Sequence, residues 1–153
     1  MSSGLVAITE NKKSGMVNPI PFWPAITVKE LRDDYRIYSS IGDDACLKAL
    51  EFAYIVVTDA LDSYALDKER AGIESLEDLP EREQFRQVRL FKVAVYSLAK
   101  QKLSESYLDV DLTRKPGSDM RESVGDATPL LNSDYNEAIR RFLGKPASFV
   151  ALV

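Results

Sequence analysis

EREQFRQVRLFKVAVYSLAKQKLSESYL, residues 81–108, is the stretch that decides the fold of this chain. Its apolar residues recur at the spacing of one helical face, and further apolar residues widen that face on both sides. From Leu90 to Ala99 the segment is apolar nearly all round, and a helix of that kind has to be covered by several neighbours. The stretch therefore predicts a long central helix with the remaining elements packed around it.

Three further helices are expected around this central one. Thr27-Val28-Lys29-Glu30 has the form of a capping box, so a short N-terminal helix should run over about Val28–Tyr38. A long helix is expected over about Asp44–Arg70, ended by Gly72, and a C-terminal helix should end at Gly144. The short connection between the two long helices indicates an antiparallel hairpin. The predicted fold class is all-α: a helical bundle built on a long antiparallel helix hairpin, with a short N-terminal helix, a C-terminal helix and an extended or β-like C-terminal tail.

The N-terminal end of the chain differs from its middle. Residues 1–18 are small and polar and predict a flexible N-terminal arm. The next segment, Pro19–Pro24, holds three prolines, which exclude a helix and force an extended path. Its aromatic residues Phe22 and Trp23 are expected to anchor the arm on the helical domain, which we place at residues 19–146. A polyproline ligand peptide is the alternative interpretation of this segment.

Residues 147–153 form an apolar tail that is too short for a helix and suited to a strand. Because no second strand is predicted, the tail either packs on the bundle or is offered to a partner by β-augmentation. We interpret it as a docking tail. Its large apolar members are Phe149, Val150, Leu152 and Val153.

The overall composition is that of an ordinary globular domain. Of 153 residues, 45% are hydrophobic and 29% are charged, which predicts one domain with its own core. The sequence holds no run of about 18 apolar residues, as a membrane span requires, and its start lacks the features of a signal peptide. Cys46 is the single cysteine and cannot form an internal disulfide, so we expect a protein made in a reducing cytosol.

The sequence offers little to an enzyme. It contains no histidine, which excludes Ser–His and Cys–His nucleophile pairs within the chain. Asp109, Asp111 and Asp119 lack the calcium-loop pattern and are interpreted as solvated loop residues. Asp59 and Asp62 lie close to the same face of the long helix predicted before the central one, with no identifiable partner base. We therefore expect no catalytic residue, no bound metal and no cofactor.

Charge is distributed unevenly along the chain. Residues 1–80 hold 14 acidic and 8 basic residues, a net charge of −6, whereas residues 81–153 hold 10 acidic and 12 basic residues, a net charge of +2. Arg82, Arg86 and Arg89 recur at helical spacing and form one basic edge, suited to phosphate or to an acidic protein surface. The acidic residues of the preceding loop are Glu74, Glu77 and Asp78. Complementary halves favour head-to-tail self-association, and chance scatter over a solvated surface is the alternative.

A series of markers appears in a fixed order over residues 20–153. They are Phe22-Trp23-Pro24, a helix end at Ala71-Gly72, the loop Leu76–Pro80, a helix end at Leu103–Tyr107, and Gly144-Lys145-Pro146. In this order and spacing the chain resembles the head completion, or head stabilisation, proteins of contractile-tailed temperate phages of the peduovirus type. Gly125 and Pro129 depart from the more continuous last helix expected of that family, and residues 1–18 show no family marker.

The resemblance implies a structural virion protein of the neck, the head–tail junction, made in the host cytoplasm. Such a head–tail connector, or adaptor, is expected to form a homo-oligomeric ring of about 12 copies beneath the portal protein. The ring extends the DNA channel and seats the downstream neck or tail completion protein, while double-stranded DNA passes without specific binding. The resemblance further implies that the basic edge and the acidic loop residues meet at the subunit interface, and that the tail 147–153 docks on the portal.

The residues alone leave a second function open, a cytosolic helical binding or regulatory module that recognises a peptide or small ligand. Such a module would have a concave apolar site with convergent polar groups. The net charge of −4 argues against a dedicated duplex-binding protein, which would carry a basic face. No membrane partner is expected.

Overall fold

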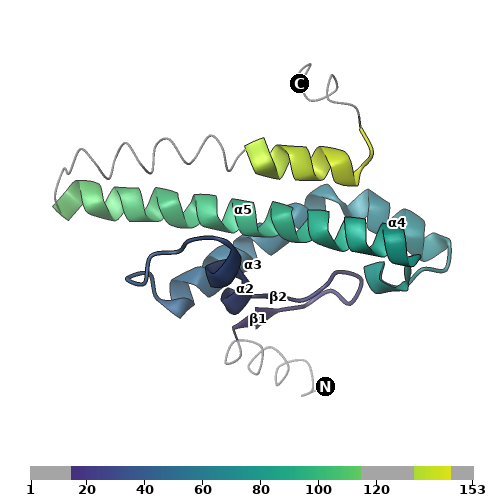
Figure 1. Ribbon diagram of the computed structural model, residues 1–153, viewed down its shortest axis with the longest axis horizontal. Helices are drawn as coiled ribbons and strands as arrows, with labels where there is room; N and C mark the ends of the chain where they lie inside the picture. The colour runs from purple at the N-terminus through teal and green to yellow at the C-terminus, as the bar shows by residue number, and fades with distance from the viewer. Residues whose placement is uncertain (1–14, 115–132, 146–153) are drawn as a thin grey trace.

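The computed structural model of the protein describes residues 15–114 and 133–145, with side chains described as far as residue 106 in the first range. Its named elements are β1 (Met16–Val17), β2 (Ile26–Thr27), α2 (Val28–Asp34), α3 (Asp43–Ala60), α4 (Asp62–Arg70), the 3-10 turn η1 (Leu76–Asp78) and α5 (Glu81–Arg114). A last helix covers residues 133–142. Figure 1 shows α5 as the longest helix, with the 133–142 helix along one side of it and α2, α3 and the strands along the other.

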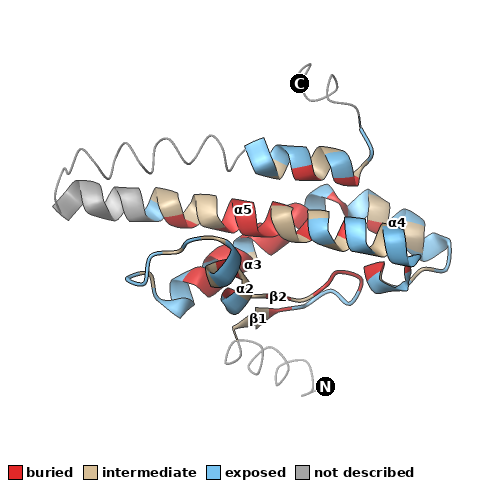
Figure 2. Cartoon of the chain, in the orientation of Figure 1, coloured by how far each residue is buried: buried red, intermediate tan, exposed pale blue. Residues whose placement is uncertain are grey.

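α5 is the central helix predicted from the sequence, and it extends further, to Arg114. Its middle is enclosed, because Phe91 and every residue from Ala94 to Ala99 are buried (Figure 2). α3 packs along one side of this helix. From another side, Glu30 Oε2 of α2 accepts a hydrogen bond of 2.5 Å from the Tyr96 hydroxyl. The prediction of a mostly helical fold is confirmed.

The expectation of an all-α fold is wrong in one respect, because the described residues include a small sheet. β1 and β2 pair antiparallel, with Met16 opposite Thr27 and Val17 opposite Ile26. Strands of two residues are too short to produce an alternating pattern in the sequence, so periodicity does not reveal them. The pairing buries Val17 at 7% exposure, although it falls in the predicted arm 1–18. Residues 1–14 of that arm lie outside the described residues.

The predicted first helix is too long. α2 ends at Asp34 instead of Tyr38, because Tyr35 has an extended backbone with φ −126° and ψ 118°. In this conformation the Tyr35 ring lies 5.9 Å from the ring of Tyr96 on α5, and Ile37 packs against the core. Tyr35 and Ile37 therefore pack against the core from a segment that is not helical.

The predicted second helix is two helices. Leu61, between α3 and α4, has φ −107° and ψ 10°, outside the helical region. The helix is bent there but not separated, since Leu61 N–H still donates to the Val57 carbonyl at 3.0 Å and Ala65 N–H to the Leu61 carbonyl at 3.2 Å. Leu61 is fully buried, so core packing holds the bend. No glycine or proline marks it in the sequence.

Both glycines predicted to end helices do so. Gly72 and Gly144 have left-handed backbones, with φ +90° and +70°. After each of them, the next residue donates its N–H to the carbonyl five residues earlier, at 2.9 Å and 3.0 Å respectively. This is the Schellman arrangement, which satisfies the last carbonyls of a helix and favours glycine because a Cβ is unfavourable at such φ values.

An aromatic cluster joins four parts of the chain. Trp23 stacks on Phe91 of α5, with ring centroids 4.8 Å apart and an interplanar angle of 8°. The Phe22 ring meets Trp23 edge-on at 4.8 Å. Phe142 of the last helix lies 5.8 Å from Trp23 and 4.7 Å from Tyr64 of α4. The predicted extended path of Pro19–Pro24 is wrong, because this segment turns at residues 20–23, where Trp23 N–H donates to the Ile20 carbonyl at 3.2 Å. This turn, α4, α5 and the last helix therefore share one core.

Candidate functional site

The three arginines of the predicted basic edge have different surroundings. Arg86 donates one hydrogen bond to the Arg141 carbonyl at 2.8 Å and another to Gln87 Oε1 at 3.0 Å. All three arginines are exposed, but within the described residues Arg82 and Arg89 form no ion pair or hydrogen bond. Arg86 therefore holds the last helix on α5, and the edge available to another molecule consists of Arg82 and Arg89.

Phe85 lies between these two arginines on the same side of α5, and the sequence analysis missed it. It is 76% exposed, more than any other large hydrophobic side chain among the described residues. The signal was in the spacing, because Phe85 is three residues after Arg82 and four before Arg89, away from the apolar face of the helix. We call Arg82, Phe85 and Arg89 the α5 stripe.

The acidic loop residues surround the turn η1 just before α5. Glu74, Glu77 and Asp78 are all exposed. The turn beneath them is fixed, since Leu76 is fully buried and donates its N–H to the Phe22 carbonyl at 3.1 Å. These carboxylates and the first turn of α5 therefore lie at the same end of the subunit.

The remaining predicted site residues fall into two groups. Phe22 and Trp23 are buried, at 2% and 3% exposure, within the aromatic cluster. The predicted portal-docking residues Phe149, Val150, Leu152 and Val153 lie outside the described residues. So does Asp119, and the side chains of Asp109 and Asp111 are likewise not described.

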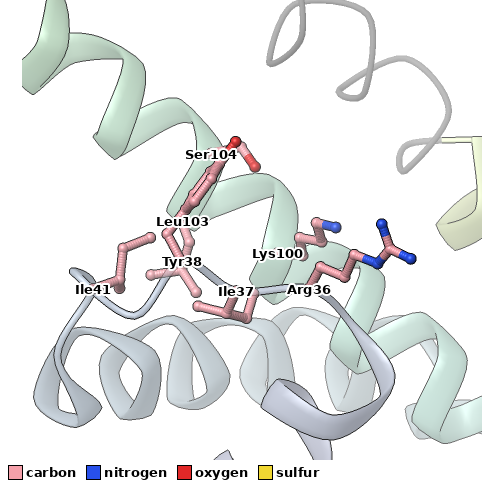
Figure 3. A pocket seen from close by; sticks show the side chains of 7 residues that line it. All are labelled: Arg36, Ile37, Tyr38, Ile41, Lys100, Leu103 and Ser104. Carbon is pink, nitrogen blue, oxygen red and sulfur yellow. The ribbon is translucent and has the colours of Figure 1, made fainter. Parts of the chain in front are cut away.

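A small pocket opens between α5 and the loop after α2 (Figure 3). Its volume is about 30 Å³, enough for roughly one water molecule and far below the several hundred Å³ typical of small-molecule sites. It is lined by Arg36, Tyr38 and Ile41 on one side and by Lys100, Leu103 and Ser104 on the other. The pocket lends no support to recognition of a small ligand.

The side chain of Cys46, the single cysteine of the chain, is not accessible to solvent. Cys46 is fully buried in α3, and burial raises the pKa of its thiol, so the reactive thiolate is disfavoured. Across residues 15–106 and 133–145, no three His, Cys, Asp or Glu side chains are grouped so that they could hold a metal ion. Among the helices of the described part, none is both long enough and apolar enough to cross a membrane.

Comparison with known proteins places the chain in a family. The family model for "phage head completion protein (GPL)" matches residues 17–153. Searches of curated proteins and of solved structures gave no significant match. The matched range includes the α5 stripe, the acidic loop and the aromatic cluster. The chain therefore belongs to the family of phage head completion proteins, structural proteins of the bacteriophage head.

Proposed function

We propose that this protein is the head–tail connector, or adaptor, of a tailed phage. In this proposal about 12 copies form a ring beneath the portal. The ring extends the DNA channel and provides the seat for the next neck or tail completion protein. The observation that carries the proposal is the family match over residues 17–153 together with the exposed α5 stripe within that range.

The chemistry of the α5 stripe supports a protein–protein contact. A phenylalanine that is 76% exposed buries little of its side chain in an isolated subunit. Aromatic residues and arginines are enriched where protein interfaces bind most strongly, in both obligate and transient complexes. A closed ring needs heterologous contacts, in which one surface of a subunit meets a different surface of its neighbour. The exposed acids Glu74, Glu77 and Asp78 are the acceptor surface that the sequence predicts.

Each subunit in the proposed ring has a body and two docking ends. The body is a helical bundle built on the hairpin of α3–α4 and α5. The arm 1–18 is anchored through the buried Phe22 and Trp23. The tail 147–153 docks on the portal by adding an extended segment to it, and its apolar residues Phe149, Val150, Leu152 and Val153 supply the contact.

The net charge of the subunit suits a DNA channel. At −4 per chain, a ring accumulates fixed negative charge. Fixed anions repel the phosphates of a passing duplex, so DNA crosses the ring without adhering to its wall. A protein that lines the DNA channel beneath the portal is located in the neck of the virion.

Reconstitution with the portal tests the proposal. Purified full-length protein is mixed with portal rings of the phage that encodes it, and the mixture is studied by sedimentation velocity and negative-stain electron microscopy. We expect a discrete complex with added density on one end of the portal. A protein that binds no portal and is absent from purified virions by mass spectrometry would contradict the proposal. A monomeric isolated protein is compatible with it, because such a ring can require the portal for assembly.

A further inference from the structure

A second exposed stripe runs along α3 and α4. Its members follow one another at steps of three and four residues, which keeps them on one side of the helices. We call Phe52, Ile55, Asp59, Asp62 and Leu66 the α3–α4 stripe, and all five are exposed. Its three hydrophobic side chains are 44%, 58% and 43% exposed, in chain order. Lys102 Nζ of α5 lies over the Phe52 ring, 4.8 Å from its centroid, so Phe52 is partly covered within its own chain. The stripe therefore combines two carboxylates with an apolar strip that is least covered at Ile55 and Leu66.

The α5 stripe has the opposite charge and the same kind of spacing. Both stripes repeat at alternating steps of three and four, the pattern by which two helices pack side by side. Among the described residues there are six exposed large hydrophobic side chains, and four of them lie on these two stripes. The carboxylates of one stripe and the arginines of the other are complementary in charge. Each stripe also has exposed apolar area, at Ile55 and Leu66 on one and at Phe85 on the other.

The stripes lie on different sides of the subunit. The α3–α4 stripe lies on the side of α3 opposite the buried Leu50, Ala53 and Val57. The α5 stripe lies on the side of α5 opposite the buried Phe91 and Val95. The buried faces of α3 and α5 pack against each other. One copy therefore cannot join its own two stripes, and each copy offers one stripe to each of two neighbours. Such a head-to-tail arrangement closes into a ring when the rotation between neighbouring copies completes a full circle.

We propose that neighbouring copies of this chain pair through these two stripes. The arginines of the α5 stripe face Asp59 and Asp62 of the next copy, and Phe85 packs among the apolar residues beside them. This inference rests on the proposed ring and replaces the acidic loop as its acceptor surface. The loop is the weaker complement, because it carries no exposed large hydrophobic residue to receive Phe85 and lies at the same end of the subunit as Arg82.

Duplex DNA is a different occupant for an arginine–phenylalanine surface, since arginine binds phosphate and aromatic rings stack on unpaired bases. Two observations favour a second copy. Glu81 is exposed directly beside Arg82 and would repel phosphate. DNA binding would also leave the apolar residues of the α3–α4 stripe uncovered. The experiment therefore includes a measurement of duplex DNA retention.

The test is a charge exchange in the phage that encodes the protein, with its own gene deleted and full-length variants supplied from a plasmid. One variant is Arg82→Glu/Arg89→Glu, which makes both stripes acidic. The other is Asp59→Arg/Asp62→Arg, which makes both stripes basic. Asp33→Arg/Asp34→Arg, at exposed positions of α2 outside both stripes, is the matched control. Circular dichroism and thermal unfolding establish that each variant folds.

The readouts are infectious titre and copies of this protein per purified particle. We expect each stripe variant alone to lower both by about 100-fold or more, because like charges then face each other at every contact. Supplied together, the two variants should restore titre to within about tenfold of wild type, since every contact of an alternating ring is again complementary. The control should behave as wild type.

Three results would overturn the inference. Normal particles with either stripe variant alone would mean that the stripes are not the contact. Rescue of Arg82→Glu/Arg89→Glu by Glu77→Arg/Asp78→Arg, and not by Asp59→Arg/Asp62→Arg, would identify the loop as the acceptor. Loss of duplex DNA retention by the purified Arg82→Glu/Arg89→Glu variant, with no rescue by either partner, would assign the α5 stripe to DNA. Failure of the proposed function is a separate result, in which even wild-type protein is absent from particles.

Discussion

The indole ring of Trp23 lies flat on the phenyl ring of Phe91, with centroids 4.8 Å apart and planes 8° from parallel. The contact joins the proline-rich segment, which has no regular structure of its own, to the helix on which the fold is organised. Phe22 and Phe142 complete the enclosure of the indole. The N-terminal segment and the last helix are therefore fixed on α5 by the same side chain.

Replacing Trp23 by alanine should remove this link. The side chain is 3% exposed, so Trp23→Ala should lower the free energy of unfolding by about 3–5 kcal/mol. Ile20→Ala, in the same segment but 40% exposed, is the control and should cost less than about 1 kcal/mol. Urea unfolding followed by circular dichroism measures both. An equal decrease in the free energy of unfolding for the two variants would show that Trp23 is not the main contact between this segment and α5.

Arg86 and Gln87 should control the docking of the last helix. The Gln87 carboxamide, buried at 3% exposure, donates to the Phe142 carbonyl at 3.1 Å, and Arg86 donates to the carbonyl of the preceding residue. Both acceptors are end carbonyls of a helix, which need such partners. Arg86→Ala/Gln87→Ala should raise amide hydrogen exchange across residues 133–142 by about 10-fold or more, corresponding to the loss of one or two such bonds.

The matched control for that experiment is Arg70→Ala, which removes an exposed arginine at the end of α4. It should leave exchange over residues 133–142 at the wild-type rate. Exchange in α3 should also stay unchanged in the double variant. A double variant whose last helix exchanges as slowly as in wild type would show that aromatic packing alone holds the helix.

Two buried tyrosines should make the protein sensitive to high pH. The Tyr54 hydroxyl donates to the Ile20 carbonyl at 3.3 Å, and burial raises the pKa of Tyr54 from 10.0 to about 12. Burial, followed by its hydrogen bond to Glu30, also raises the pKa of Tyr96. A raised pKa means that the folded protein keeps protons that the unfolded chain loses above about pH 10. These tyrosines therefore stabilise the fold fully below that pH, and their contribution declines above it.

The expected result is a free energy of unfolding that falls from about pH 10 towards about pH 12, by up to about 1.4 kcal/mol per pH unit for each tyrosine. Urea unfolding over this range measures it. Tyr54→Phe removes one titrating group and should reduce the slope. Equal slopes in the wild type and in Tyr54→Phe would rule out a contribution from Tyr54.

Deleting the tail should separate folding from portal binding. Removal of residues 147–153 leaves every described element and the aromatic cluster in place. We expect the truncated chain to keep the circular dichroism spectrum and urea midpoint of the wild type, and to lose binding to portal rings in sedimentation velocity. Portal binding at wild-type affinity by the truncated protein would show that the tail is not the docking element.

The elements that the sequence predicts well are those set by local chemistry. The capping box is one example, since Thr27 Oγ1 accepts a hydrogen bond from Glu30 N–H at 3.1 Å. Even there the prediction is incomplete, because the Glu30 carboxylate contacts Tyr96 and Lys92 of α5 and not its own helix end. The end of α2 and the bend at Leu61 depend on packing against distant residues, which local spacing does not encode.

In the candidate site, too, local spacing predicts some features and contacts with distant residues determine the others. Helical spacing placed Arg82, Arg86 and Arg89 on one side of α5. It could not reveal that Arg86 is occupied, because its acceptor, the Arg141 carbonyl, lies 55 positions further along the chain. Phe85 lies outside the apolar face of α5, so helical periodicity assigns it no place in the core. Its exposure becomes evident only once the neighbours of the helix are known.

Electron cryo-microscopy of the neck in purified virions of the phage that encodes this protein tests the proposed ring most directly. We expect a ring directly beneath the portal, each subunit of which fits the α5-centred fold with the α5 stripe of one copy against its neighbour. A neck without this fold beneath the portal, or density for this protein in the capsid shell or tail instead, would show that the protein is not the connector.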